Sequence, residues 1–268
     1  MEVKISKGKN ISLKGSAEKV ISEFLSKTYS VKPVNFHGLK PKLSIKVGDS
    51  VLAGDSLFFD KDFEKIQFVA PVSGKVDKII RGEKRKLLEV VIKADKKNKY
   101  KKYNISGYQK YNIEKLKELF YESGLWSLIK QRPFDALADP IKLPKSIFIS
   151  CFDSSPLAPD YDFILSSKEK EFQRGIDVIS SFCDGKVHLN VDGNSDPVFF
   201  KKIQSTQLNK FHGPHPAGNV GVQIHHIDPI NKGDVVWVIT PQSIVTIGNF
   251  FLTGRYQNYK TIAVTGSE

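Results

Sequence analysis

The sequence predicts a multidomain protein of mixed α and β content, in which a compact all-β module precedes an α/β module. Up to residue 95, short apolar segments alternate with Gly-Asp, Pro and Gly turns, a pattern typical of an all-β unit. From residue 111 to 268, apolar residues at helical spacing alternate with strand-like runs, which is typical of an α/β domain. Residues 96–110 form a lysine-rich linker between the two. With 268 residues and 40% hydrophobic content, the chain can bury a core in each module.

Positive charge is concentrated in the first part of the chain. The formal net charge is +12, and residues 1–110 hold 25 basic and 12 acidic side chains while the remainder holds 16 and 17. This asymmetry predicts a docking face for an acidic partner, such as another protein, anionic lipid heads or nucleic acid. Lys93 to Lys102 carries six lysines, which fits either docking or a solvated linker. Only Tyr100 and Tyr103 lie near this run, so the stacking platform of an RNA-binding surface is not expected.

The sequence contains no candidate membrane span. Its longest apolar stretch, Val235 to Ile239, has the length of a strand. The N-terminus, Met1 to Ile5, alternates as a strand does and shows no signal-peptide pattern. We therefore expect a cytoplasmic chain whose membrane contact is peripheral.

Neither cysteines nor histidines predict a metal site. Cys151 and Cys183 lie beside apolar neighbours without metal-ligand spacing, which favours two buried thiols over a disulfide. Four histidines fall within fifteen residues: His212, His215, His225 and His226. The last two are adjacent, so on a strand they would face opposite ways. We expect a structural loop with imidazoles bonded to the backbone, and no bound metal.

The first module contains two informative segments, Val47 to Phe58 and Val69 to Val76. Each places a Gly at a tight turn between apolar residues. These segments resemble the barrel-sandwich hybrid fold of lipoyl and biotinyl carrier domains. The resemblance implies a hairpin tip near Lys61, the position of a carrier's modified lysine. The surrounding Asp-Lys-Asp departs from the carrier pattern, so a docking and structural module is favoured, with a carrier or interaction module without a redox role as the alternative.

The second module begins with a helix and a buried strand. Asn112 is expected to cap a helix that ends at Gly124 and carries one apolar face: Ile113, Leu116, Leu119 and Phe120. Lys145 to Phe152 then reads as a strand of a parallel sheet.

Further helices and strands follow in alternation. Ser166 and Glu169 form a capping-box pattern before apolar residues at helical spacing: Phe172, Ile176, Ile179 and Phe182. The next predicted strands are Lys186 to Val191 and Val235 to Ile239. A helix follows from Thr240-Pro241 to Gly254, with Ile244, Ile247 and Phe251 on one face, and Tyr259 to Val264 is the last predicted strand.

The position where such a fold would hold a nucleotide lacks the required glycines. Binding a dinucleotide needs backbone amides close to the phosphates, hence a glycine-rich turn. The stretch from Glu122 to Phe134 keeps one glycine, and Leu125, Trp126 and Leu128 would fill the phosphate volume. No site for flavin or NAD is therefore predicted.

Several motifs together resemble one protein family. They are Glu122-Ser-Gly-Leu-Trp126, Ser150-Cys-Phe-Asp-Ser-Ser-Pro156, Phe211-His-Gly-Pro-His-Pro-Ala-Gly218, Pro241-Gln-Ser-Ile-Val-Thr-Ile-Gly248 and Arg81-Gly-Glu-Lys-Arg85. This set is similar to the A subunit of the bacterial sodium-translocating NADH:quinone oxidoreductase. That family is itself similar to the flavin subunit of respiratory complex I, which implies a Rossmann-like second domain. The relatives carry a glycine-rich flavin loop where this chain has Ser123 to Trp126, and an acidic turn where it has Ser155-Pro156.

The resemblance implies a role within a larger assembly. We expect a peripheral subunit on the cytoplasmic side of the bacterial inner membrane, docked chiefly on a membrane subunit, with no catalytic residue and no tightly bound cofactor of its own. Reduction of ubiquinone or menaquinone and sodium transport would then belong to the complete complex. The family also implies a β-grasp domain and a helical segment after Ser267, both absent from this sequence.

A quinone is the one small molecule for which the sequence suggests contacts. A quinone needs apolar walls and one or two hydrogen-bond donors for its carbonyl groups. Phe36-His37 and Arg132-Pro133-Phe134 each combine an aromatic ring with a donor beside a Gly or Pro. The candidate contacts are therefore Phe36, His37, Arg132 and Phe134, with packing at the seam between the modules as the alternative for the two phenylalanines.

Overall fold

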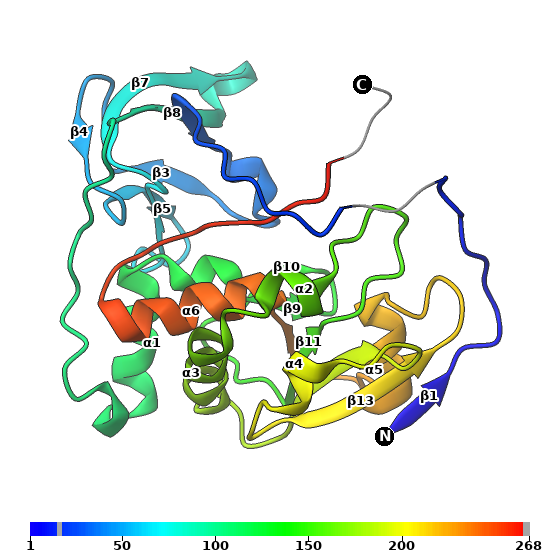
Figure 1. Ribbon diagram of the computed structural model, residues 1–268. Coiled ribbons are helices and arrows are strands. Elements are labelled where there is room, and N and C mark those ends of the chain that lie inside the picture. The colour runs from blue at the N-terminus through cyan, green and yellow to red at the C-terminus, as the bar shows by residue number, and fades with distance from the viewer. Residues whose placement is uncertain (15–17, 265–268) are drawn as a thin grey trace. The chain divides into compact units, whose positions relative to one another are not determined.

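A computed structural model describes residues 1–14 and 18–264, which divide into two compact units (Figure 1). Residues 24–142 and 249–258 form one, called here the β unit. Of the described residues, 1–14, 18–23, 143–248 and 259–264 form the other, called here the α/β unit. No helix in the described ranges is long and apolar enough to cross a bilayer.

Two antiparallel sheets build the β unit. One has the order β2-β8-β7-β4, with β2 at Thr28–Val31, β4 at Ser50–Val51, β7 at Gly74–Arg81 and β8 at Leu87–Ala94. The other has the order β3-β5-β6, with β3 at Pro41–Leu43, β5 at Ser56–Asp60 and β6 at Gln67–Val69. Apolar residues alternate into its core, where the Phe58 and Phe68 rings stack 5.1 Å apart. The predicted all-β module of barrel-sandwich type is confirmed.

Short helices complete the β unit. Helix α1, Ile113–Glu122, begins where predicted, because Asn112 Oδ1 accepts a hydrogen bond from Lys115 N at 3.0 Å. Four 3₁₀ turns lie at Pro33–Asn35 (η1), Glu83–Arg85 (η2), Tyr108–Lys110 (η3) and Leu125–Leu128 (η4). Strands β9, Lys130–Arg132, and β10, Ala136–Leu137, form an antiparallel hairpin.

The lysine-rich linker is bonded to the β unit. Ala53 N donates to Lys99 O and Lys101 N donates to Ala53 O, both at 2.9 Å. Tyr103 Oη donates to Gly54 O at 2.8 Å and burial raises the pKa of its phenol. Backbone pairing therefore fixes the path of this segment, while its lysine side chains reach solvent.

A parallel sheet forms the centre of the α/β unit. Its strands lie in the order β1-β13-β12-β11-β14, with bounds Glu2–Lys4, Gln207–His212, Val187–Asp192, Ser146–Ser150 and Val236–Val238. From β11 the chain moves outward to β12 and β13 and then crosses back to β14 on the other side of β11. This reversal is the switch point of a doubly wound sheet, and the predicted Rossmann-like α/β domain is confirmed.

The N-terminal strand closes one edge of this sheet. The sequence predicts a strand at Met1 to Ile5, and β1 pairs in parallel with β13, Glu2 opposite Lys210 and Lys4 opposite His212. The amino group of Met1 donates to Leu208 O at 3.2 Å, and Ile5 N donates to His212 O at 2.8 Å. A strand from the start of the chain thus protects an edge built some two hundred residues later.

Four helices connect the strands of this sheet: α2 (Tyr161–Leu165), α3 (Glu169–Ser180), α4 (Val198–Lys201) and α5 (Val220–Ile227). Helix α6 (Pro241–Thr253) follows β14. Ile224 of α5 packs on Phe148 and Val236 of the sheet. Helices α3 and α6 approach closely, because a Cβ atom at Gly248 would lie 1.6 Å from Glu171 O. The last turn of α6, from Asn249, belongs to the β unit.

Two predicted features of the α/β unit are wrong. Ser166 does not cap α3: its hydroxyl donates to Phe163 O at the end of α2, and Lys168 at the N-cap of α3 makes no side-chain cap. Tyr259 to Val264 is not a strand. Its central residue Thr261 instead gives both backbone groups to the side chain of Gln242, at 2.7 and 2.9 Å, so no ladder forms.

The structure differs from expectation at the histidine pair and at one strand. His226 Nδ1 lies 2.9 Å from the backbone oxygen of Val222, as expected of these imidazoles, but the pair is not in a loop. His225 and His226 lie on helix α5, where Asn219 Oδ1 accepts from Gly221 N at the start of the helix. No pattern in the sequence predicts strand β13, because most of its Gln-Leu-Asn-Lys-Phe-His residues are polar and one of them, Asn209, is nevertheless buried.

Candidate functional site

The loop after α1 is filled by its own side chains. Gly124 has φ 77°, and a Cβ atom there would lie 2.7 Å from Val69 Cγ2, so only glycine fits. Leu125 and Trp126 are fully buried, and Trp126 Nε1 donates to Ala138 O at 2.9 Å. Of the three bulky residues in this stretch, Leu125 and Trp126 pack into the core and Leu128 is half-buried.

The four predicted quinone contacts lie in the β unit, and two of them touch. His37 Nδ1 lies 3.3 Å from Phe134 O, which joins the two segments that the sequence placed almost a hundred residues apart. The Phe134 side chain is 82% exposed, and its φ of 81° lies in a region that side-chain-bearing residues avoid. Phe36 is half-buried and its ring meets Phe68 edge-on at 4.6 Å.

Charged residues next to Phe134 in the chain form ion pairs with one another. Arg132 Nη2 lies 3.1 Å from Asp135 Oδ1, and Lys130 Nζ lies 3.0 Å from Asp135 Oδ2. Arg132 Nε is buried and has no hydrogen-bond partner within the described residues. The arrangement offers one solvent-facing aromatic ring with imidazole and guanidinium donors from neighbouring residues, which suits a flat apolar molecule with carbonyl acceptors.

A second polar cluster lies where β11 and β13 of the α/β unit end. Ser154 Oγ lies 2.9 Å from His215 Nδ1 and accepts from Gly218 N at 3.0 Å. The N-terminal segment joins the same loop, since Asn10 Oδ1 accepts from His215 N at 2.8 Å and Lys9 N donates to His215 O. The sequence motifs around Ser154 and His215 are therefore one hydrogen-bonded structure.

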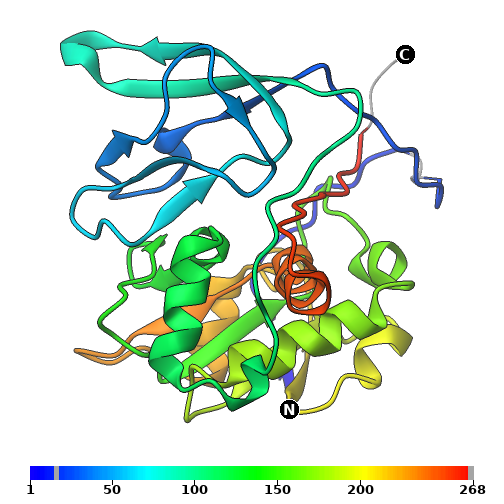
Figure 2. The ribbon, with the colours of Figure 1, turned by 90° about the vertical axis from the view of Figure 1, so that its left-hand side faces the viewer.

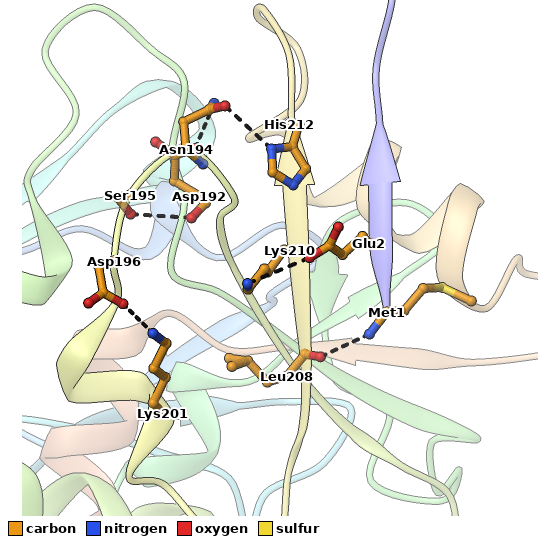
Figure 3. A network of polar contacts seen from close by, with 10 residues as sticks. All are labelled: Met1, Glu2, Asp192, Asn194, Ser195, Asp196, Lys201, Leu208, Lys210 and His212. Carbon is orange, nitrogen blue, oxygen red and sulfur yellow. Dashed lines mark hydrogen bonds and ion pairs between the residues drawn. The ribbon is translucent and has the colours of Figure 1, made fainter.

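The neighbouring loop after β12 is bonded to β13 (Figure 3). Asp192 Oδ1 accepts from both the backbone N and the Nδ2 of Asn194, and Asn194 Oδ1 lies 3.3 Å from His212 Nδ1. Lys210 forms an ion pair with Glu2 of β1 at 3.5 Å. The carboxyl edge of the sheet, where doubly wound folds bind ligands, is thus occupied by the chain's own polar side chains.

One face of the sheet buries a chain of polar groups beneath this edge. Asn209 Nδ2 donates to Asn190 Oδ1 at 2.8 Å, Asn190 Nδ2 to Gln223 Oε1 at 2.9 Å, and Gln223 Nε2 to Ala217 O at 3.3 Å. His188, only 4% exposed, accepts from Asn209 at 3.3 Å. Burial lowers the pKa of His188 to about 4, so the ring is neutral at pH 7 and serves as an acceptor.

The remaining candidate residues take structural or exposed positions. Cys151 is buried, which raises the pKa of its thiol, and Cys183 Sγ donates to Pro144 O; neither forms a disulfide. Within the described ranges, no group of His, Cys, Asp and Glu side chains has the arrangement of a metal site. Lys61 is exposed in the six-residue loop between β5 and β6, and its backbone N donates to Lys40 O.

Sequence reasoning missed the contact between Ser154 and His215, although both motifs were recognised. The position of each motif at the end of a strand could have predicted the contact, because the carboxyl ends of parallel strands lie at one edge of the sheet. What was lacking was strand β13, without which the second motif had no place in the sheet.

Comparison with known proteins gives matches across both modules. A family model described as the NqrA N-terminal barrel-sandwich hybrid domain matches residues 3–95, and one described as the NqrA second alpha/beta domain matches residues 111–256. Curated relatives are named as the A subunit of the Na(+)-translocating NADH-quinone reductase. The protein from Neisseria gonorrhoeae is 34% identical over 98% of this chain and 60% of its own length. The Marinomonas and Pseudomonas aeruginosa proteins are also 34% identical, over 99% and 98% of this chain. The chain thus spans about 60% of the length of these relatives.

Proposed function

Because this chain belongs to the NqrA family, the A subunit of the Na(+)-translocating NADH-quinone reductase, we propose that it is a peripheral component of such a complex. It takes part in electron transfer from NADH to a quinone, and in sodium transport, only within that complex. It docks on the membrane subunits from the cytoplasmic side of the inner membrane. The match of two family models along both modules is the observation that carries this proposal.

Within this role, the chain holds no flavin or NAD at the loop after α1. Leu125 and Trp126 fill the volume where the phosphates would lie, and Trp126 Nε1 is already bonded to Ala138 O. The redox cofactors then belong to other subunits. Purified alone, the chain should show no flavin absorption, and a flavin spectrum that survives gel filtration would contradict this point.

A quinone contacts the exposed surface made by Phe36, His37, Arg132 and Phe134. The support is geometric: His37 Nδ1 lies beside the backbone oxygen of Phe134, Phe134 faces solvent in a strained backbone conformation, and Arg132 lies two residues before it in the chain. Such a surface would contribute to quinone access, because the ring can stack on a flat apolar headgroup while nearby donors meet its carbonyl oxygens.

A photoreactive quinone analogue tests this contact on the purified chain. Phe134→Ala should lower specific labelling of segments 36–39 and 132–135 by about fivefold to tenfold, equivalent to the roughly 1–1.4 kcal/mol of a strong aromatic contact. Phe24→Ala is a matched control, because Phe24 is an exposed phenylalanine of the same unit, 86% exposed against 82%. Equal labelling of the two variants, or no labelling of either segment in the wild type, would refute the quinone contact.

Membership of the complex is tested separately. A tagged form of the chain should capture membrane subunits of the reductase from native membranes of its source, and cross-linking should place lysines of the β unit beside them. Recovery of the chain without any reductase subunit would count against docking, whatever the quinone experiment gives.

A further inference from the structure

The hairpin of β7 and β8 is the most strongly basic element of the β unit. Between Gly74 and Ala94 it carries seven basic and three acidic side chains, and the turn between the strands reads Arg81-Gly-Glu-Lys-Arg-Lys86. In Figure 2 the hairpin, coloured cyan to teal, ends in a turn at the outer edge of the β unit. The side chains of Arg81, Lys84, Arg85 and Lys86 are all exposed.

These cations are not neutralised by the chain. In the part of the chain that the structure describes, no ion pair joins a lysine or arginine of this hairpin to an acidic side chain. By contrast, Lys40, Lys42 and Lys65 elsewhere in the β unit each have an acidic partner. Positive side chains gathered at one tip without acidic partners repel one another. Their presence there indicates that an anion from outside the chain pairs with them.

The backbone holds two of these cations in an unfavourable conformation. Lys84 and Arg85 have φ of 51° and 60°, a region where Gly or Asn would cost less. The turn is fixed by Gly82 N donating to Lys86 O at 2.9 Å and by Arg81 Nη1 donating to Arg85 O at 3.0 Å. The turn conformation does not favour Lys and Arg at these two positions. Their presence therefore indicates a role for the charged side chains rather than for the turn.

Apolar side chains accompany the charge. Ile80 and Leu88, at the ends of the two strands beside the turn, are 39% and 37% exposed. Cations that can reach headgroups, next to aliphatic groups that can enter the acyl boundary, are the combination found in membrane-surface anchors.

We propose that the tip of the β7–β8 hairpin, residues 80–88, binds the anionic phospholipid surface of the membrane. This inference rests on the proposed docking role, and it adds to that role the surface that the hairpin tip binds. The phosphates accept hydrogen bonds from Arg81, Lys84, Arg85 and Lys86, while Ile80 and Leu88 contact the headgroup boundary.

Size favours a lipid surface over an acidic protein as the occupant. A stable protein interface buries roughly 800 Å² on each partner, with twenty or more residues. The tip offers nine residues, of which four are cations. A lipid surface needs no shape complementarity, and each Lys or Arg close to it strengthens binding by about fivefold.

Vesicle flotation with the full chain tests the proposal. The probes are vesicles of phosphatidylcholine alone and of phosphatidylcholine mixed with phosphatidylglycerol. Binding should require phosphatidylglycerol and weaken with salt. The variant Lys84→Gln/Arg85→Gln should weaken the partition coefficient by about 25-fold, at fivefold for each cation lost.

The control variant is Lys96→Gln/Lys97→Gln, which removes the same charge from two exposed lysines of the same unit outside the hairpin. It should weaken binding by less than about threefold, since these lysines would lie beyond a Debye length from the bound surface. A circular dichroism melt of each variant checks that the fold is retained.

Three outcomes would overturn the proposal: no binding to anionic vesicles, equal binding to both vesicle types, or equal losses in the two variants. If the hairpin variant also loses capture of the membrane subunits while vesicles are never bound, the occupant is an acidic protein surface. A negative vesicle result by itself does not contradict membership of the complex, because co-purification measures that membership separately.

Discussion

Contacts within the chain stabilise two loops by different interactions. Apolar packing stabilises the loop after α1 in the β unit, and hydrogen bonds stabilise the loop after β11 in the α/β unit. The first is filled by Leu125 and Trp126, which are fully buried. The second is held by Ser154, whose hydroxyl meets His215 Nδ1 and Gly218 N at 2.9 and 3.0 Å. The stability of an apolar packing contact depends on the volume of the side chains and is insensitive to pH. The stability of a hydrogen-bonded contact depends on the donor–acceptor distances and on the protonation of the groups.

The two loops therefore differ in the kind of interaction that satisfies them. In doubly wound folds the ligand normally covers the backbone amides at the carboxyl ends of the strands. In this chain, side chains accept hydrogen bonds from two such amides: Ser154 Oγ accepts from Gly218 N, and Asp192 Oδ1 accepts from Asn194 N in the loop after β12. Removing the side chain that stabilises each loop should therefore have a different effect in each.

The largest effect is expected at the apolar loop. Trp126→Ala removes a fully buried indole and leaves Ala138 O without its donor, which should lower the free energy of unfolding of the β unit by about 3–5 kcal/mol. Urea unfolding followed by far-UV circular dichroism measures the loss, and amide exchange in α1 and β9 locates it. Trp126→Phe should cost less, because it keeps most of the volume.

Phe134→Ala is the matched control for this prediction. The Phe134 side chain lies in the turn between β9 and β10 of the same unit and is 82% exposed, so its truncation should change stability by less than about 0.5 kcal/mol. A Trp126→Ala protein as stable as this control would mean that the loop is not closed by packing.

A pH effect of similar size is expected in the α/β unit. Burial lowers the pKa of His188 to about 4, whereas an unfolded histidine has a pKa near 6.5. Between these values the unfolded chain binds the additional proton, so stability rises with pH through this window and levels off above it. The loss on acidification should approach about 3 kcal/mol at pH 4.

Urea titrations at several pH values between 4 and 7 measure this dependence, with His188→Gln as the comparison. The variant lacks the titrating ring, so its slope in this window should fall by nearly one proton. An unchanged slope would show that His188 titrates normally and that the buried polar chain with Asn209 tolerates its charge.

Local patterns predicted those parts of the fold that local interactions decide. Asn112 caps α1 because its side chain reaches an amide three residues on, and Phe172 and Ile176 face the core because they are spaced four apart on a helix. The filled loop at Trp126 was predictable for the same reason: a phosphate cradle requires glycines, and their absence is visible in the sequence.

Long-range polar pairing decided the remainder. Asn209 in β13 is buried because Asn190 and His188 of the next strand accept its hydrogen bonds, and no pattern within β13 reveals those partners. Thr261 looked like part of a strand, but Gln242 takes both of its backbone groups. His37 and Phe134 lie on segments far apart in the sequence, and only the tertiary structure shows that these segments adjoin.

The smallest effect is expected at the polar loop, where one hydroxyl can be removed. Ser154→Ala deletes the acceptor of Gly218 N and the partner of His215 Nδ1, at a cost of about 1 kcal/mol to local stability. Amide exchange at Gly218 should become about fivefold faster, as 1 kcal/mol corresponds to that factor. Ser155→Ala is the control, because Ser155 is an exposed neighbour and only its backbone groups, which the change preserves, form hydrogen bonds here. If both variants exchange alike, the loop is held by its backbone contacts to the N-terminal segment, through Lys9 and Asn10, rather than by Ser154.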